Sequence, residues 1–215
     1  VREALAEVVT TYQAPAVRFA VQPRHDRRWC LVINPTDLHV GKRQDIEDEG
    51  VATVLETARE RLTMALGEVL ACVPSTPEVI YLCVGGDWLN IDNWLGTTTR
   101  GTPQQSTGSF RSIWAEACRA ALDAVGLCLD VAPVEVIHVP GNHDRALGGC
   151  MVDLIAAHFR EEPRVTVRED RGSYVALRYG QNMHLFHHGD GIGTAGGLAG
   201  MMASERPTMW GQTRH

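Results

Sequence analysis

The chain of 215 residues is long enough to bury one substantial hydrophobic core, so we expect one principal domain over residues 29–215, after a leading helix and linker over residues 1–28. Its composition, 44% hydrophobic and 21% charged, is that of an ordinary globular protein, and its formal net charge of -6 excludes a broadly basic surface for nucleic acid, although not a local basic groove. No apolar run approaches the roughly 20 residues that a membrane span needs, and no leader pattern opens the chain, so we expect a cytoplasmic protein without membrane contact.

Six cysteines are spread through the chain without a Cys-x-x-Cys spacing. This distribution argues against a cysteine metal site or a disulfide framework and indicates mostly buried, small hydrophobic residues in a reducing compartment. The residues are Cys30, Cys72, Cys83, Cys118, Cys128 and Cys150.

Helical and extended patterns alternate along the chain, which predicts an α/β protein. In chain order the expected elements are a helix over 1–12, a strand over 29–34, a helix over 50–71, a strand over 78–84, a helix over 113–125, a strand over 134–139, a helix over 151–159, and strands over 165–168, 174–178 and 183–187. The short gap between the last two strands predicts a hairpin.

The first two predicted strands each end in residues of a type that can bind metal. Asp37 and His39 follow strand 29–34, and residues two apart in an extended or turn conformation can face one ion together. Asp87 follows strand 78–84 in a Gly-Gly-Asp turn, where a carboxylate could bridge two cations. Taken singly, each motif is also typical of an ordinary surface turn.

A long polar loop, residues 88–109, separates the second strand from the next helix. Loops of this length in a compact domain are usually functional or mobile. Its section 97–104 is rich in threonine and contains Arg100, so it could form a lid whose hydroxyls and guanidinium face a phosphate. A solvated loop without function explains the same composition equally well.

The third and the last predicted strands show the same feature. Strand 134–139 stops at Pro-Gly and is followed by Asn142, His143 and Asp144, which a polar turn satisfying its own backbone would also explain. Strand 183–187 runs into His187 and His188. These two point to opposite faces if the strand persists, so we expect only one of them to be a ligand.

The recurrence of ligand-type residues at four strand ends resembles the calcineurin-like metallophosphoesterase superfamily. The motifs that carry the resemblance, in order, are Asp37-x-His39, Gly86-Asp87, Gly141-Asn142-His143-Asp144 and His188-Gly189. It spans roughly residues 30–190 and is specific as an ordered set, although each part alone is weak. The resemblance implies a two-layered β-sandwich core flanked by helices, with a two-metal site at the strand ends.

The resemblance also implies a role for each site residue. Asp37 and His39 would hold the first ion. Asp87 would bridge both ions. Asn142 and His188 would hold the second ion. His143 would stand beside the scissile phosphate, with Asp144 orienting it, and could protonate the leaving oxygen or stabilise the developing charge. Two cations would neutralise the phosphoester and activate water; we expect Mn, with Fe, Zn or Mg as alternatives.

One motif of the superfamily is missing from the chain. Members usually close the site with a later Gly-His-x-His, and His215 follows Arg214 rather than glycine. We therefore expect the C-terminal part of the domain to lie beyond the sequence given, and we assign no ligand role to His215.

The residues in and around these motifs indicate the class of substrate. The Gly-Asp-Trp-Leu-Asn stretch and the loop after it are similar to phage-encoded members described as DNA-repair exonuclease-like, and no Asp-Arg-Gly of the protein phosphatases follows Asp87. We therefore expect a hydrolase acting on phosphodiester bonds, in the first place a nuclease with DNA as its partner. The alternatives are a small-molecule or cyclic-nucleotide phosphodiesterase, and a catalytically inactive scaffold of the same fold.

Overall fold

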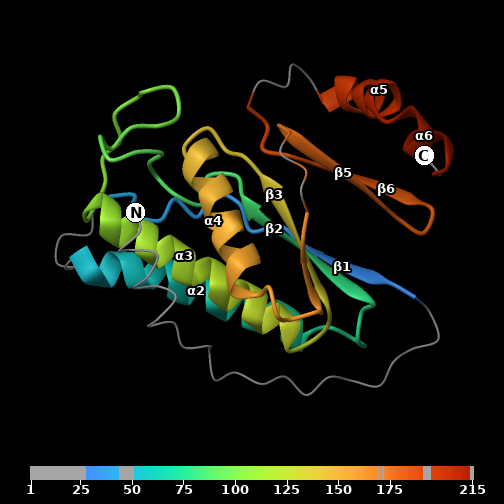
Figure 1. Ribbon diagram of the computed structural model, residues 1–215, viewed down its shortest axis with the longest axis horizontal. Coiled ribbons are helices and arrows are strands. Elements are labelled where there is room, and N and C mark those ends of the chain that lie inside the picture. The colour runs from blue at the N-terminus through green and yellow to red at the C-terminus, as the bar shows by residue number, and fades with distance from the viewer. Residues whose placement is uncertain (1–27, 44–50, 169, 171, 191–194, 214–215) are drawn as a thin grey trace.

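Four parallel strands form the centre of the molecule (Figure 1). The computed structural model describes residues 28–43, 51–168, 170, 172–190 and 195–213. The strands lie in the order of the chain: β1 (Cys30–Ile33), β2 (Val79–Gly85), β3 (Val134–Val139) and β4 (Val165–Val167). The helix expected over residues 1–12 lies outside the described residues.

Helices connect these strands and cover one face of the sheet (Figure 1). They are α2 (Val51–Ala71), α3 (Phe110–Leu129) and α4 (Arg145–His158). Alternate residues of the strands, such as Ile80, Leu82 and Val136, point into the main core with these helices. This βαβ arrangement confirms the predicted α/β class, and it places the carboxyl ends of β1, β2 and β3 at one edge of the sheet.

A two-stranded antiparallel hairpin covers the other face. It consists of β5 (Tyr174–Tyr179) and β6 (Asn182–His187), joined through Gly180 at a positive φ of 58°, as the hairpin prediction requires. Val175 and Phe186 of the hairpin pack with Tyr81 and Ile137 of the central sheet in a second, smaller core. The described residues therefore form a parallel sheet with helices and a small hairpin, whereas the sequence predicted a two-layered β-sandwich.

Two elements at the C-terminal side were not predicted. Helices α5 (Ala195–Glu205) and α6 (Pro207–Gly211) follow the hairpin. The hydroxyl of Tyr174 donates to Glu205 Oε2 at 2.5 Å, and Arg206 lies 5.6 Å above the ring of Tyr174, so the helices are attached to the hairpin. Among the described helices, none is long and apolar enough to cross a membrane.

The cysteines behave partly as predicted. All six are free thiols, and Cys83, Cys118 and Cys128 are buried. Their burial raises the pKa of Cys83 and Cys128 to about 12, so these thiols are inert packing groups. Cys72 and Cys150 are exposed, in contrast to the expectation of mostly buried positions.

Candidate metal centre

The turns after β1, β2 and β3 are hydrogen-bonded to one another at the sheet edge. The amides of Asp37 and His39 donate to the carbonyl oxygens of Gly86 and Asp87 at 2.9 and 3.0 Å. The amide of Gly86 in turn donates to Val139 O at 2.6 Å. The backbone thus holds the three predicted motifs in register, and their side chains emerge at one place.

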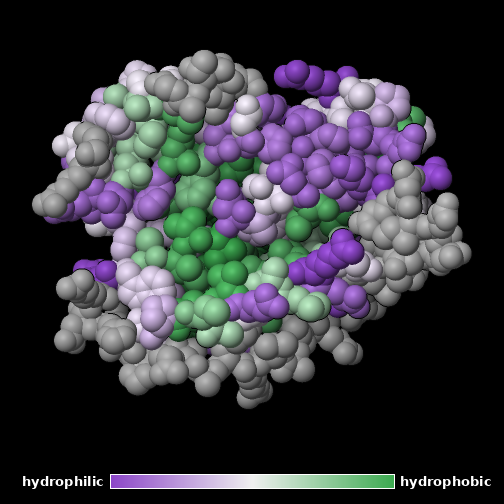
Figure 2. Space-filling model, turned by 180° about the vertical axis from the view of Figure 1, so that it is seen from behind, coloured by the Kyte–Doolittle hydropathy of each residue, from purple (hydrophilic) through white to green (hydrophobic). Residues whose placement is uncertain are grey.

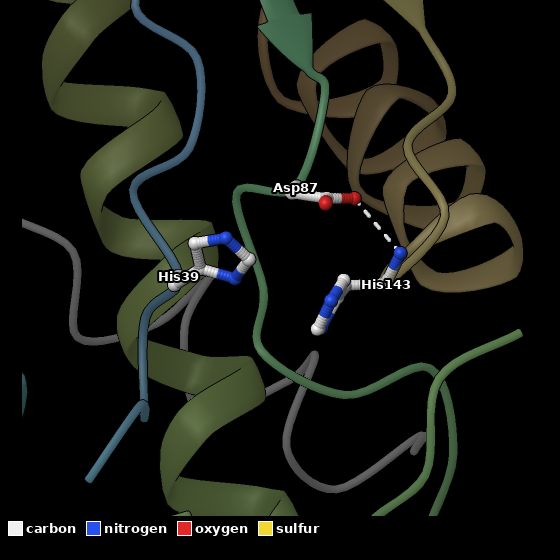
Figure 3. A group of neighbouring side chains, drawn as sticks. All are labelled: His39, Asp87 and His143. Carbon is white, nitrogen blue, oxygen red and sulfur yellow. Dashed lines mark hydrogen bonds between the residues drawn. The ribbon is translucent and has the colours of Figure 1, made fainter. Parts of the chain in front are cut away.

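Three of these side chains point toward one another, as Figure 3 shows. One ligand-type atom from each of His39, Asp87 and His143 lies within 4.8 Å of the others. The two imidazole rings meet edge to face, with centroids 4.7 Å apart. Asp87 is buried and the histidines are partly buried, so this group can hold a metal ion.

The His188 side chain contacts the same carboxylate and also the side chain of Asn142. His188 Nε2 lies 3.3 Å from Asp87 Oδ2 and 3.0 Å from Asn142 Oδ1. Asp87 Oδ1 accepts a hydrogen bond from the His143 amide at 2.8 Å. The Asp87 carboxylate therefore lies within the group that contains His39 and His143 and also contacts His188.

Asp37 stands at the outer side of the first group. Its Oδ1 lies 3.7 Å from His39 Nε2, while 63% of its side chain remains exposed. The structure thus brings Asp37 beside His39, but in a more open position than the buried Asp87.

The backbone is strained at three of the predicted ligands. Asp37, His39 and Asp87 have φ values of 58°, 45° and 65°, and they are the non-glycine residues with positive φ in the part of the chain that the structure describes. Such conformations cost roughly 1–3 kcal/mol each and concentrate at functional sites, where neighbouring structure enforces them. These three positions are therefore those at which the neighbouring turns determine where a candidate ligand side chain points.

His39 is held in the form that binds metals. Burial lowers the pKa of His39, the nearby His143 lowers it further, and Asp87 opposes the change. Its Nδ1 is buried without a hydrogen-bond partner among the described residues. A neutral imidazole with an unsatisfied buried nitrogen suits a metal ligand, because ligation requires the deprotonated form.

Asp144 lies beneath the site rather than in it. Its fully buried carboxylate accepts hydrogen bonds from the amides of Asp87, Leu89 and Gly141 at 3.2 to 3.3 Å. Burial raises the pKa of Asp144 to about 6, although the Leu89 amide opposes the shift. These contacts fix the backbone that carries the ligands.

The orientation of His143 comes from a residue that the sequence did not suggest. His143 Nδ1 lies 3.1 Å from the carbonyl oxygen of Asn90, so this contact fixes the orientation of the ring and does not involve Nε2. The described hydrogen bonds of the Asp144 carboxylate run to backbone amides, so the predicted orienting role of Asp144 stays a prediction. No sequence pattern marks Asn90, because a backbone carbonyl can belong to any residue.

Gly141 has no room for a side chain. A Cβ atom there would collide with the Oδ1 and backbone nitrogen of Asp87 and would come within 2.7 Å of Asp144 Oδ1. We expect Gly141→Ala to displace Asp87, to lower the free energy of unfolding by about 1–3 kcal/mol and to weaken metal binding.

Thermal melts and metal titrations check this expectation. The matched control is Gly67→Ala, because a Cβ at this position within α2 would meet nothing within 4 Å. The control should leave metal binding unchanged and gain up to about 1 kcal/mol of stability from helix propensity. Equal metal affinity in both variants would contradict the close packing at Gly141.

Comparison of the chain with protein-family models, curated proteins and solved structures found no match. The function must therefore be inferred from the residues of the site.

Proposed function

We propose that the protein is a metal-dependent phosphoesterase that hydrolyses phosphodiester bonds. The observation that supports this most strongly is the shared carboxylate of Asp87, which faces His39 and His143 on one side and His188 on the other. A carboxylate in contact with two groups of nitrogen and oxygen ligands is the arrangement that a pair of divalent cations requires.

We assign the predicted ligands to two such ions. Asp37, His39 and Asp87 would hold one, and Asp87, Asn142 and His188 the other. Imidazole, carboxylate and amide donors suit Mn, Fe or Zn, with Mg as a harder alternative. The cations, when bound, supply positive charge that offsets the phosphoester and lower the pKa of water.

The remaining residues act on the substrate. His143, oriented by the Asn90 carbonyl, would donate a proton from Nε2 to the leaving oxygen. Lys42 and Arg145 are exposed and lie close in sequence to site residues: the Lys42 amide donates to the carbonyl oxygen of His39, and Arg145 opens α4 directly after Asp144. Both cations can contact a phosphate.

These local cations favour a nucleic acid as substrate, in the first place DNA. They provide a basic rim on a chain whose net charge is -6. The negative net charge of the chain favours the second candidate, a phosphodiesterase for small molecules or cyclic nucleotides, because such an enzyme needs fewer phosphate contacts. If the protein has the fold of the metallophosphoesterases that it resembles, the hairpin β5–β6 would belong to the second layer of a β-sandwich.

Hydrolysis assays with added Mn²⁺ test the proposal. Wild-type protein should cleave bis(p-nitrophenyl) phosphate and end-labelled single-stranded or duplex DNA, and EDTA should abolish both activities. Cleavage of the small diester without cleavage of DNA would favour the second candidate. Bound metal without any hydrolysis would leave an inactive scaffold.

A further inference from the structure

Trp94 is an unusual residue on the surface of the loop over residues 88–109. Its side chain is 76% exposed. Among the large hydrophobic residues that are exposed in the described part of the chain, Trp94 is the aromatic residue. The side of the molecule on which this loop lies is mainly hydrophilic (Figure 2). An indole that is neither packed nor screened by its own loop is available for a ligand.

The loop that carries Trp94 is firmly attached next to the metal centre. Asp92 Oδ1 accepts hydrogen bonds from the amides of Ala146 and Leu147, both at 2.9 Å, and so caps the first turn of α4. The Asp92 amide donates to Thr97 O at 2.8 Å, which closes the turn around Trp94. The backbone of the turn that carries Trp94 is therefore fixed relative to the first turn of α4.

A second attachment limits the distance between Trp94 and the reacting groups. The carbonyl oxygen of Asn90 lies 3.1 Å from Nδ1 of His143. Trp94 is four residues after Asn90, and four residues span at most about 14 Å in a fully extended chain. The amide of Thr99, on the other side of the turn, donates to Asn142 O at 3.1 Å. The Cα atom of Trp94 therefore lies within about 14 Å of that of Asn90, a distance over which a polymer bound at the site can extend.

The charges around the site are complementary to such a polymer. Lys42 is exposed beside His39, and its charge contributes to the lowered pKa of that histidine. Arg145 is 46% exposed, and its guanidinium lies 3.4 Å from Asp190, which partly neutralises it. Arg100 is exposed on the same loop as Trp94. Cations near the site combined with an exposed aromatic ring are features that bind single strands.

We propose that Trp94 is a stacking platform for an unpaired base of a single-stranded nucleic acid bound at the metal centre. The inference rests on the proposed function, because it names the substrate class of the same site. Stacking is sequence-tolerant, since every base has a π-face, and it requires a base that is not already stacked in a duplex.

Binding of a fluorescein-labelled phosphorothioate single-stranded DNA oligonucleotide, which resists hydrolysis, is measured by anisotropy with added Mn²⁺ and tests the inference. Trp94→Ala should weaken binding by roughly 5- to 100-fold, whereas Trp94→Phe should retain most of the affinity. Leu95→Ala is the matched control, because Leu95 is 65% exposed next to Trp94 but cannot stack. Circular dichroism should show all variants folded.

Several results would overturn the inference. These are equal binding by wild type and Trp94→Ala, equal losses in Trp94→Ala and Leu95→Ala, no binding by the wild type, or a dimer that Trp94→Ala converts to a monomer. A similar loss with a single-stranded RNA oligonucleotide supports stacking, and so does a smaller loss with duplex DNA. Hydrolysis of bis(p-nitrophenyl) phosphate separates the two proposals: a hydrolysing wild type whose DNA binding ignores Trp94 refutes only the platform.

Discussion

Substituting Asp87 by asparagine is expected to lower the affinity for divalent cations by more than about 100-fold and to abolish measurable hydrolysis. The reason is that Asp87 would contribute to both proposed ligand groups. Residues that only hydrogen-bond to metal ligands typically change metal affinity by 10- to 100-fold, so the loss of a direct ligand should have a larger effect. Asparagine keeps an oxygen for the His143 amide, so the turn should persist. Metal content by mass spectrometry and turnover of a small diester measure both effects.

Stability distinguishes the loss of a ligand from misfolding. Asp87 is 3% exposed, and its replacement removes a buried charge, so the melting temperature in EDTA should not fall. The control is Asp130→Asn, an exposed residue at the C-terminal end of α3 that should bind metal as the wild type does. Full metal content and activity in Asp87→Asn would contradict the bridging role.

Replacing His143 by alanine is expected to lower turnover by about 10²- to 10⁴-fold while leaving the metal content unchanged. His143 is oriented by Asn90 and lies against the ring of His39, where it can deliver a proton. Because p-nitrophenolate leaves without protonation, the defect should be smaller for bis(p-nitrophenyl) phosphate than for DNA. The ratio of the two defects measures the acid role directly.

The control for this variant is His158→Ala, a partly buried histidine at the far end of α4, which should retain full activity. Loss of metal from His143→Ala would instead make His143 a ligand, a role that the group in Figure 3 permits, and would contradict its assignment as the acid. Equal defects on both substrates would also count against proton donation.

The strands could be predicted because their sequence pattern is local. The apolar run over residues 134–139 coincides with β3, and the polar turns after β1, β2 and β3 carry the residues that meet at the site. The parallel order brings these turns together, and the sequence alone indicates it through alternation of strands and helices.

Other features depend on contacts between distant parts of the chain. Helix α4 begins at Arg145, six residues before the predicted helix, although Gly148 and Gly149 disfavour helix. Its first turn is capped by Asp92, more than fifty residues away, which no local pattern reveals. The positive φ angles at the ligands and the support from the Asn90 carbonyl are likewise set by neighbouring turns rather than by residue type.

The sandwich prediction went beyond what the sequence pattern supports. It came from the family resemblance, whereas the strands recognised from residue patterns alone are those that the structure contains. Two of them form the hairpin on the second face of the sheet, where Val175 and Phe186 complete a small core. The apolar, glycine-rich sequence of α5 has no clear helical stripe, so it offered no periodic signal.

The most direct test of the account is the number of Mn²⁺ ions bound per wild-type chain, determined by equilibrium dialysis with metal analysis. The account predicts two ions per chain, with both sites weakened together in Asp87→Asn because they share this carboxylate. Fewer than one ion per chain at millimolar Mn²⁺ would contradict it.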